Sequence, residues 1–145
     1  MTSDTIAGLE AKLAQSPILR AKSTPSAEEV EKASQEIGLA FAADYQEFIL
    51  MFGGAMVGSF PIFGLRPVEV MGEVWSVIDV TKRYRDDGVP GCASWVVFSE
   101  DQAGNPIGMD EDGKVWICDH DFGGVAELAP SFEDYIRRQC LDISS

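Results

Sequence analysis

The segment from Ser26 to Gly54 constrains the fold most, because it contains two helical patterns that both end at glycine. Ser26 and Glu29 have the spacing of a capping box, which predicts that the first helix begins there. Gly38 suits the left-handed position that closes such a helix. The second pattern, from about Ala42 to Phe52, ends at a glycine pair. The segment therefore predicts two helices separated by a short connection.

Apolar residues in this segment recur every three or four positions, which places them on one face of each helix. Those faces are expected to form the core. The buried positions are predicted to be Val30, Ala33 and Ile37 in the first helix and Tyr45, Phe48, Ile49 and Phe52 in the second.

Three further helices are predicted. Apolar residues keep helical spacing from about Asp4 to Gln15. Pro67 suits a first helical turn, and the residues up to Tyr84 have a mostly helical rhythm, although their valines also favour a strand. Ser131 is expected to cap the last helix. The inward side chains of that helix are predicted to be Phe132, Tyr135, Ile136 and Cys140.

The other apolar segments are short and predict strands. Residues 56–64 are interrupted by glycine and proline, which indicates one irregular or edge strand. From Trp95 onward the pattern is typical of a β-meander, with Asp112-Gly113 as a hairpin turn. Its strands are expected at 95–99, 106–110, 114–119 and 125–129. Trp75, Trp95 and Trp116 are expected to anchor the core.

Composition fits one globular domain of 145 residues, with 46% hydrophobic and 24% charged residues. The net charge of −13 disfavours direct binding to DNA or RNA, because it repels phosphate. The same charge favours a basic protein partner, although solubility alone is another explanation. The oligomeric state stays open.

Three cysteines occur without any CxxC pairing, at 92, 118 and 140. An odd count without a disulfide framework indicates reduced thiols. The first residues lack the pattern of a signal peptide, and no apolar stretch has the length of a membrane span. A cytoplasmic protein without membrane contact is therefore predicted.

Taken in order, several short motifs resemble the SUKH superfamily, which includes bacterial toxin-immunity proteins and fungal cell-wall-synthesis regulators. The resemblance covers about residues 26–141. The matching residues are Gly38, Asp44, Tyr45, Phe48, Gly53, Gly54, Gly104, Asn105, Asp110 to Gly113, Val115, Asp119 to Asp121, Ala129, Ser131, Phe132, Tyr135 and Ile136. Phe41-Ala42 replaces the usual Leu-Pro, and Phe52 stands where the family often has asparagine.

The resemblance implies an α+β fold with a mixed or mainly antiparallel sheet flanked by helices. It also implies a non-enzymatic protein-binding role, often the neutralisation of a toxin's nuclease or other effector domain. No cofactor is implied.

The candidate binding residues lie in an acidic segment, residues 100–127, that contains eight acids and the single base Lys114. Such a surface would mimic nucleic-acid phosphate for a basic effector. The competing explanation is that turns favour aspartate for backbone reasons. The candidate partner-binding residues are Glu100, Asp101, Asp110, Glu111, Asp112, Asp119 and Asp121.

Three chemical alternatives exist for this segment. Cys118 and His120 would form a nucleophilic pair only if the imidazole reached the sulfur, yet residues two apart on a strand are about 7 Å apart. Metal binding by His120 with Asp119 and Asp121 lacks a second histidine. A calcium loop around Asp110 to Gly113 fails because Gly108 stands at the first ligand position. We therefore expect neither a catalytic nor a metal site.

The preferred hypothesis is an immunity protein that occludes a toxin domain by steric blockade and charge complementarity. A regulatory scaffold for cellular proteins or peptides is the alternative. A small hydrolase using Cys118 and His120 is the remote one.

Overall fold

The computed structural model describes residues 1–72, 76–119 and 124–142. In these ranges the helices are α1 (Ser3–Leu13), α2 (Ala27–Ile37), α3 (Ala43–Phe52), α4 (Val77–Asp86) and α5 (Phe132–Tyr135), the last continued by a π-helical turn, Ile136–Cys140. The strands are β1 (Ala55–Val57), β2 (Phe60–Ile62), β3 (Val96–Glu100), β4 (Pro106–Met109), β5 (Val115–Asp119) and β6 (Gly124–Ala129).

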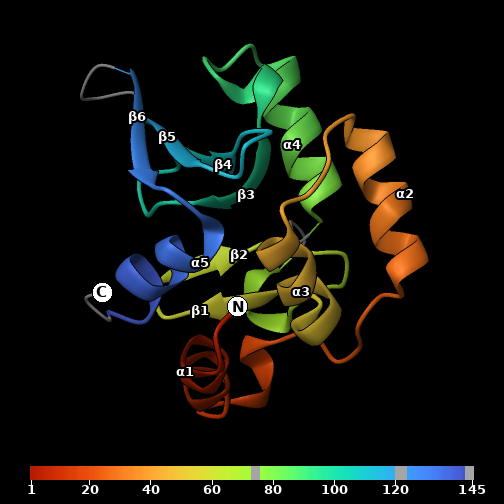
Figure 1. Ribbon diagram of the computed structural model, residues 1–145, viewed down its shortest axis with the longest axis vertical. Coiled ribbons are helices and arrows are strands. Elements are labelled where there is room, and N and C mark those ends of the chain that lie inside the picture. Colours follow the sequence, from red (N-terminus) through yellow and green to blue (C-terminus); the bar gives the residue numbers. More distant parts are fainter. Residues whose placement is uncertain (73–75, 120–123, 143–145) are drawn as a thin grey trace.

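The six strands form one sheet in which each strand lies beside the next strand along the chain (Figure 1). Every pairing between neighbouring strands is antiparallel. Helices flank the sheet, so the predicted α+β fold with a mainly antiparallel sheet is confirmed. The four strands of the expected meander lie within one residue of their predicted bounds.

The ends of α2 and α3 follow from the sequence as predicted. The Ser26 hydroxyl accepts a hydrogen bond from the Glu29 backbone N–H, and the Glu29 carboxylate accepts one from the Ser26 N–H. Gly38 and Gly53 then end the helices with φ of 86° and 76°. An L side chain at such a φ is strained, which explains the glycine at both positions.

Aromatic rings from three elements meet at the centre of the core. Tyr45 of α3, Phe98 of β3, and Phe132 and Tyr135 of α5 contact one another, with centroid separations of 5.2 to 5.7 Å. The predicted core positions of α2, α3 and the last helix are all buried. The Tyr45 hydroxyl donates to the Phe63 carbonyl, so the one polar group of that ring is satisfied.

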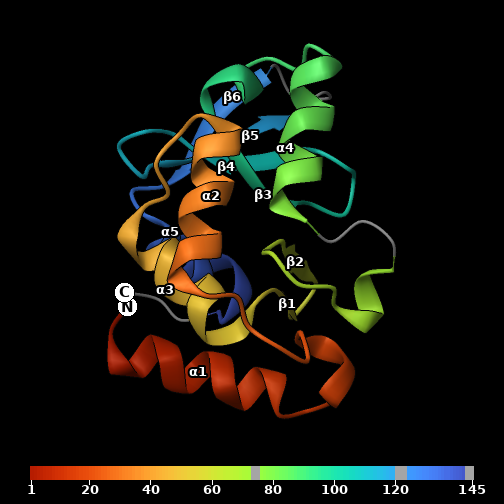
Figure 2. The ribbon, with the colours of Figure 1, turned by 90° about the vertical axis from the view of Figure 1, so that its right-hand side faces the viewer.

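The helix α4 packs against β3, and Figure 2 shows it apart from α3 and α5. The Val97 N–H donates to the Thr81 hydroxyl of α4 over 3.0 Å. The next residue, Phe98, points its ring into the cluster of α3 and α5. The backbone of β3 therefore bonds α4 within the plane of the sheet, whereas the Phe98 side chain packs against α3 and α5 on one face.

The helix predicted from Pro67 to Tyr84 is wrong in its first half. A 3₁₀ turn occupies Glu69–Met71, and α4 begins only after Ser76, whose hydroxyl accepts from the Ile78 N–H. Gly72 has φ 69° and ψ −138°, a conformation no helix continues through.

Residues 56–64 contain part of a hairpin, not the one irregular strand expected. The strands β1 and β2 pair through a two-residue turn at Gly58-Ser59. Pro61 lies opposite Met56. This pair follows Val57 and Phe60, the pair that closes the hairpin. In a two-residue hairpin that position is not hydrogen-bonded to the partner strand, so a missing N–H is tolerated there.

The tryptophans differ in burial. Trp95 is buried and lies over Gly108, where a Cβ atom would approach the Trp95 Cβ to 2.8 Å. Trp116 is half-buried at the margin of the core. Trp75 lies outside the described residues. None of the described helices has the length and apolar character needed to cross a membrane.

Candidate functional site

The acidic candidates lie at two opposite ends of the sheet, because the strands that connect them are antiparallel. Glu100 and Asp101 lie at the β3–β4 turn, and Asp119 ends β5 at the same end. Residues 110–112 form the β4–β5 turn at the other end. The four residues of β4 separate the two ends by about 13 Å. Asp121 lies outside the described residues.

Asp101 is engaged in its own turn. One carboxylate oxygen accepts hydrogen bonds from the backbone N–H groups of Ala103 and Asn105, at 2.9 and 2.8 Å. The other accepts from the Asn105 side-chain amide at 2.9 Å. Turns favour aspartate because its carboxylate can accept hydrogen bonds from the backbone of the turn in this way.

Asp110 plays the same part in the β4–β5 turn. Its Oδ1 accepts from the N–H groups of Asp112 and Lys114, at 2.9 and 3.0 Å. Its Oδ2 accepts from the Trp116 indole N–H at 2.9 Å. Asp110 therefore fixes the shape of the turn and the orientation of a half-buried tryptophan.

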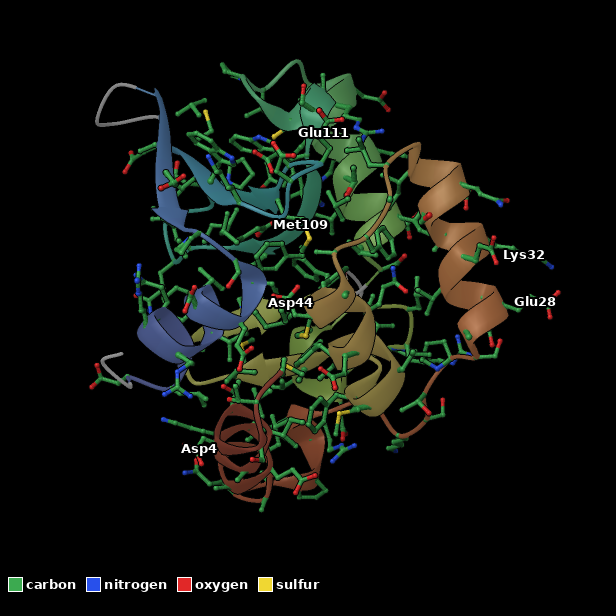
Figure 3. The ribbon with its side chains drawn as sticks, viewed as in Figure 1. Asp4, Glu28, Lys32, Asp44, Met109 and Glu111 are labelled. Carbon is green, nitrogen blue, oxygen red and sulfur yellow. The ribbon has the colours of Figure 1, made fainter. Side chains whose placement is uncertain are left out.

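Glu111 and Asp112 are the exposed acids of this turn. Their carboxylates form no hydrogen bond or ion pair with any described residue, and they point from a turn that Asp110 holds rigid. In Figure 3, Glu111 lies at the end of the sheet near α4, away from Asp44 at the start of α3. Two acidic side chains are thus presented to solvent from a turn whose backbone is bonded by Asp110.

The turn also forms one wall of a groove of about 320 Å³. The other lining residues are Leu39, Ala93 and Ser94, which come from the segment after α2 and from the 3₁₀ turn Cys92–Ser94. Its acidic wall and partly apolar floor suit a basic side chain with an aliphatic stem. We call this surface, residues 110–112 with Leu39, Ala93 and Ser94, the turn groove.

Glu100 has partners at the other end of the sheet. Its carboxylate accepts from the Arg83 guanidinium at 3.1 Å and from the Tyr84 hydroxyl at 2.9 Å, both on α4. Burial and the neighbouring Glu100 carboxylate raise the pKa of Tyr84. Arg83 and Glu100 line a hollow of about 260 Å³ whose other residues are Met56, Pro61, Phe63, Val70 and Met71. No spacing in the sequence signals this hollow, since it joins segments far apart in the chain.

The thiols are placed unfavourably for nucleophilic chemistry. Burial, with the Asp119 charge as a second cause, raises the pKa of Cys118, which is 2% exposed. Burial raises the pKa of Cys92 and Cys140 to about 12. A thiol at such a pKa holds almost no thiolate at neutral pH. His120, the other half of the proposed Cys–His pair, lies outside the described residues.

Within the described ranges, no group of three His, Cys, Asp or Glu side chains lies close enough to hold a metal ion. The Asp110 to Gly113 segment forms the hairpin turn predicted in place of a calcium loop, with Gly113 at φ 83°.

The sequence matches a described protein family over most of its length. The family model SUKH_5, described as SMI1-KNR4 cell-wall, matches residues 2–141. The chain belongs to the SUKH family. The match extends the resemblance beyond residues 26–141 to include α1 and the connector that follows it. No curated protein matched the sequence.

Proposed function

We propose that this SUKH protein is a non-enzymatic binding module that neutralises the effector domain of a bacterial toxin. The effector would be basic, and inhibition would come from steric blockade of its active surface with charge complementarity. Membership of the SUKH family is consistent with an immunity role. The three buried free thiols fit action in the reducing cytoplasm.

The supporting observation is the exposed acidic turn. Glu111 and Asp112 are exposed and without partners among the described residues, whereas Asp101, Asp110 and Glu100 make internal contacts. Charges of this kind raise the rate of encounter with a basic partner. We therefore place the first contact with the effector at the turn groove.

The test uses effector domains encoded beside the gene, with the double variant Glu111→Lys/Asp112→Lys. We expect its association rate to fall by about tenfold or more at low salt, because steering scales with local charge. The dependence of the rate on salt should flatten. Stopped-flow mixing across a range of KCl concentrations measures both quantities.

The matched control is Glu10→Lys/Glu31→Lys, two exposed acids on α1 and α2 with the same change in charge. If this control slows association as much as the turn variant, the effect belongs to net charge and the turn groove is not the contact. If no neighbouring effector binds at all, the immunity role is contradicted.

A regulatory scaffold is the second candidate, supported by the words "SMI1-KNR4 cell-wall" in the description of the family model. An immunity role predicts a large secreted toxin gene next to this one, and a regulatory role does not. The hydrolase alternative predicts that Cys118→Ala abolishes turnover in any assay in which the unsubstituted protein turns over a substrate.

A further inference from the structure

In the part of the chain that the structure describes, the outer edge of β6 has no pairing strand. The strand bonds β5 on one side, and Figure 1 shows no ribbon on its other side. Among the described residues, no backbone hydrogen bond joins β6 to a segment other than β5. An open edge presents a row of N–H and C=O groups that another strand can pair with.

The β4–β5 turn and the register of β5 with β6 determine which backbone groups of β6 point away from the sheet. The Asp110 N–H donates to the Lys114 carbonyl, so the hydrogen-bonded pairs between β4 and β5 include Gly108 with Trp116. Alternate residues of β5, including Ile117, then bond β6. Ile117 lies opposite Ala126, which leaves the backbone groups of Val125 and Glu127 pointing away from the sheet.

From Val125 to Glu127 this edge lacks the features that usually block pairing, because the register shift with β5 lies beyond Glu127, where Val115 pairs with Ala129. Val125, Ala126 and Glu127 are all exposed, and Val125 is 46% exposed. The strand contains no lysine or proline, the residues with which natural proteins protect an edge. The outer edge of β1, by contrast, is covered where Ala21 donates to the Gly54 carbonyl beside it.

The net charge of the chain favours a basic segment at this edge over a second copy of the chain. Glu127 is the only charged residue of β6, and a second copy would bring the same acid and a further net charge of −13. A basic segment would instead gain attraction from both. Val125 and Glu127 share one face of the strand, so the matching segment has an apolar and a basic residue two positions apart.

We propose that the edge of β6 accepts an extended strand from a basic protein partner by β-augmentation. This inference rests on the proposed protein-binding function and adds a second contact surface to it. Main-chain hydrogen bonds to Val125 and Glu127 would supply affinity, and the side chain opposite Glu127 would supply charge selectivity.

The probe is the synthetic peptide Thr-Lys-Thr-Val-Thr-Lys-Thr, blocked at both ends, which places lysine and valine on one face. Titration into ¹⁵N-labelled protein is followed by amide shifts and hydrogen exchange. We expect the Val125 and Glu127 amides to exchange about tenfold more slowly when nine tenths of the protein is bound. The Ala126 amide, already bonded to β5, should change less.

Two controls separate strand pairing from simple charge attraction. The same peptide with N-methylated lysine and valine keeps its charge but cannot donate to β6, and it should not protect these amides. Glu127→Lys should weaken binding more than Glu111→Lys, which makes the same change in charge at the turn groove.

Protection of Val125 and Glu127 by the unmethylated peptide alone supports the proposal. Shifts confined to residues 110–112, equal binding of the methylated peptide, or no binding overturn it. None of those results decides the toxin-binding role, which is tested separately with effector domains. Self-association of the unlabelled protein through β6 would also overturn it, because the occupant would then be a second copy.

Discussion

Arg85 lies on α4, yet its guanidinium is bonded to three backbone carbonyls in other segments. It donates to Ile37 at the end of α2, to Cys92, and to Trp95 before β3, at 2.5 to 3.2 Å. The carbonyl of Ile37 is one of those that a helix leaves without an internal partner. This single side chain therefore joins the end of α2 to the 3₁₀ turn Cys92–Ser94, which lines the turn groove.

Replacing Arg85 tests that role. Arg85→Lys keeps the charge but not the planar fork, so at least one carbonyl loses its partner. We expect the free energy of unfolding to fall by roughly 1–3 kcal/mol, the usual cost of an unsatisfied buried polar group. Urea denaturation measures it. Arg83→Lys, on the exposed side of α4, should change stability by less than about 0.5 kcal/mol, and an equal loss there would contradict the explanation.

At the scale of the elements, Glu133 joins the two ends of the chain. Its carboxylate accepts from the Thr5 hydroxyl at 2.7 Å and from the Thr2 N–H at 2.7 Å, which ties α1 to α5. Burial alone would raise the pKa of Glu133, but the hydrogen bonds from Thr5 and Thr2 outweigh it, and the pKa is lowered. The contact therefore favours the charged carboxylate.

The pH dependence of stability follows from that direction. A lowered pKa in the folded state stabilises the protein above the unfolded value of 4.5, and the contribution is lost as pH falls through the folded pKa. The Glu133→Gln variant should therefore be less stable than the unsubstituted protein at pH 7. Its stability should also fall less steeply as the pH drops below 4.5. Thermal unfolding across this range measures the difference, and parallel curves for the two proteins would contradict the assignment.

The sequence predicts elements well where local chemistry decides them. The Ser26–Glu29 capping box, the Gly38 stop and the Asp112-Gly113 turn are all fixed by residues close in the chain. The β1–β2 hairpin was missed although Gly58-Ser59 is a hairpin signal, because Pro61 argues against a strand. Gly72 was the available sign that the helix predicted from Pro67 was too long.

The candidate site was harder to predict, because it depends on contacts between distant segments. Sequence placed the acids on turns but gave no means to separate Asp110, whose oxygens are bonded, from Glu111, whose oxygens are exposed. The predicted β-meander did imply that successive turns need not share one end of the sheet, and the structure divides the acids between two ends. Leu39 joins the turn groove only through the packing of α2.

For the whole molecule, the net charge of −13 is a source of self-repulsion. Apart from the N-terminal amine, only three basic side chains form an ion pair in the described residues: Arg66, Lys82 and Arg83. Most acids are therefore uncompensated. Added salt screens this repulsion between acids, so salt should stabilise the folded state.

We expect the free energy of unfolding to rise by on the order of 1 kcal/mol between 10 and 200 mM KCl, because the screening length shortens from about 30 Å to about 7 Å. Urea denaturation at each concentration measures it. The Glu10→Lys/Glu31→Lys variant has a net charge of −9 and should gain less. A fall in stability with added salt would show that attractive pairs dominate.

The β3–β4 and β4–β5 turns have a consequence for how the binding surface of this protein can change. Their shapes depend on one aspartate each, bonded to its own backbone, and the aromatic cluster of Tyr45, Phe98 and Phe132 lies elsewhere. Changes at the tips and changes at the centre are therefore energetically independent. Under the proposed binding role, substitutions at exposed tip residues would change the preferred partner without lowering the stability of the core.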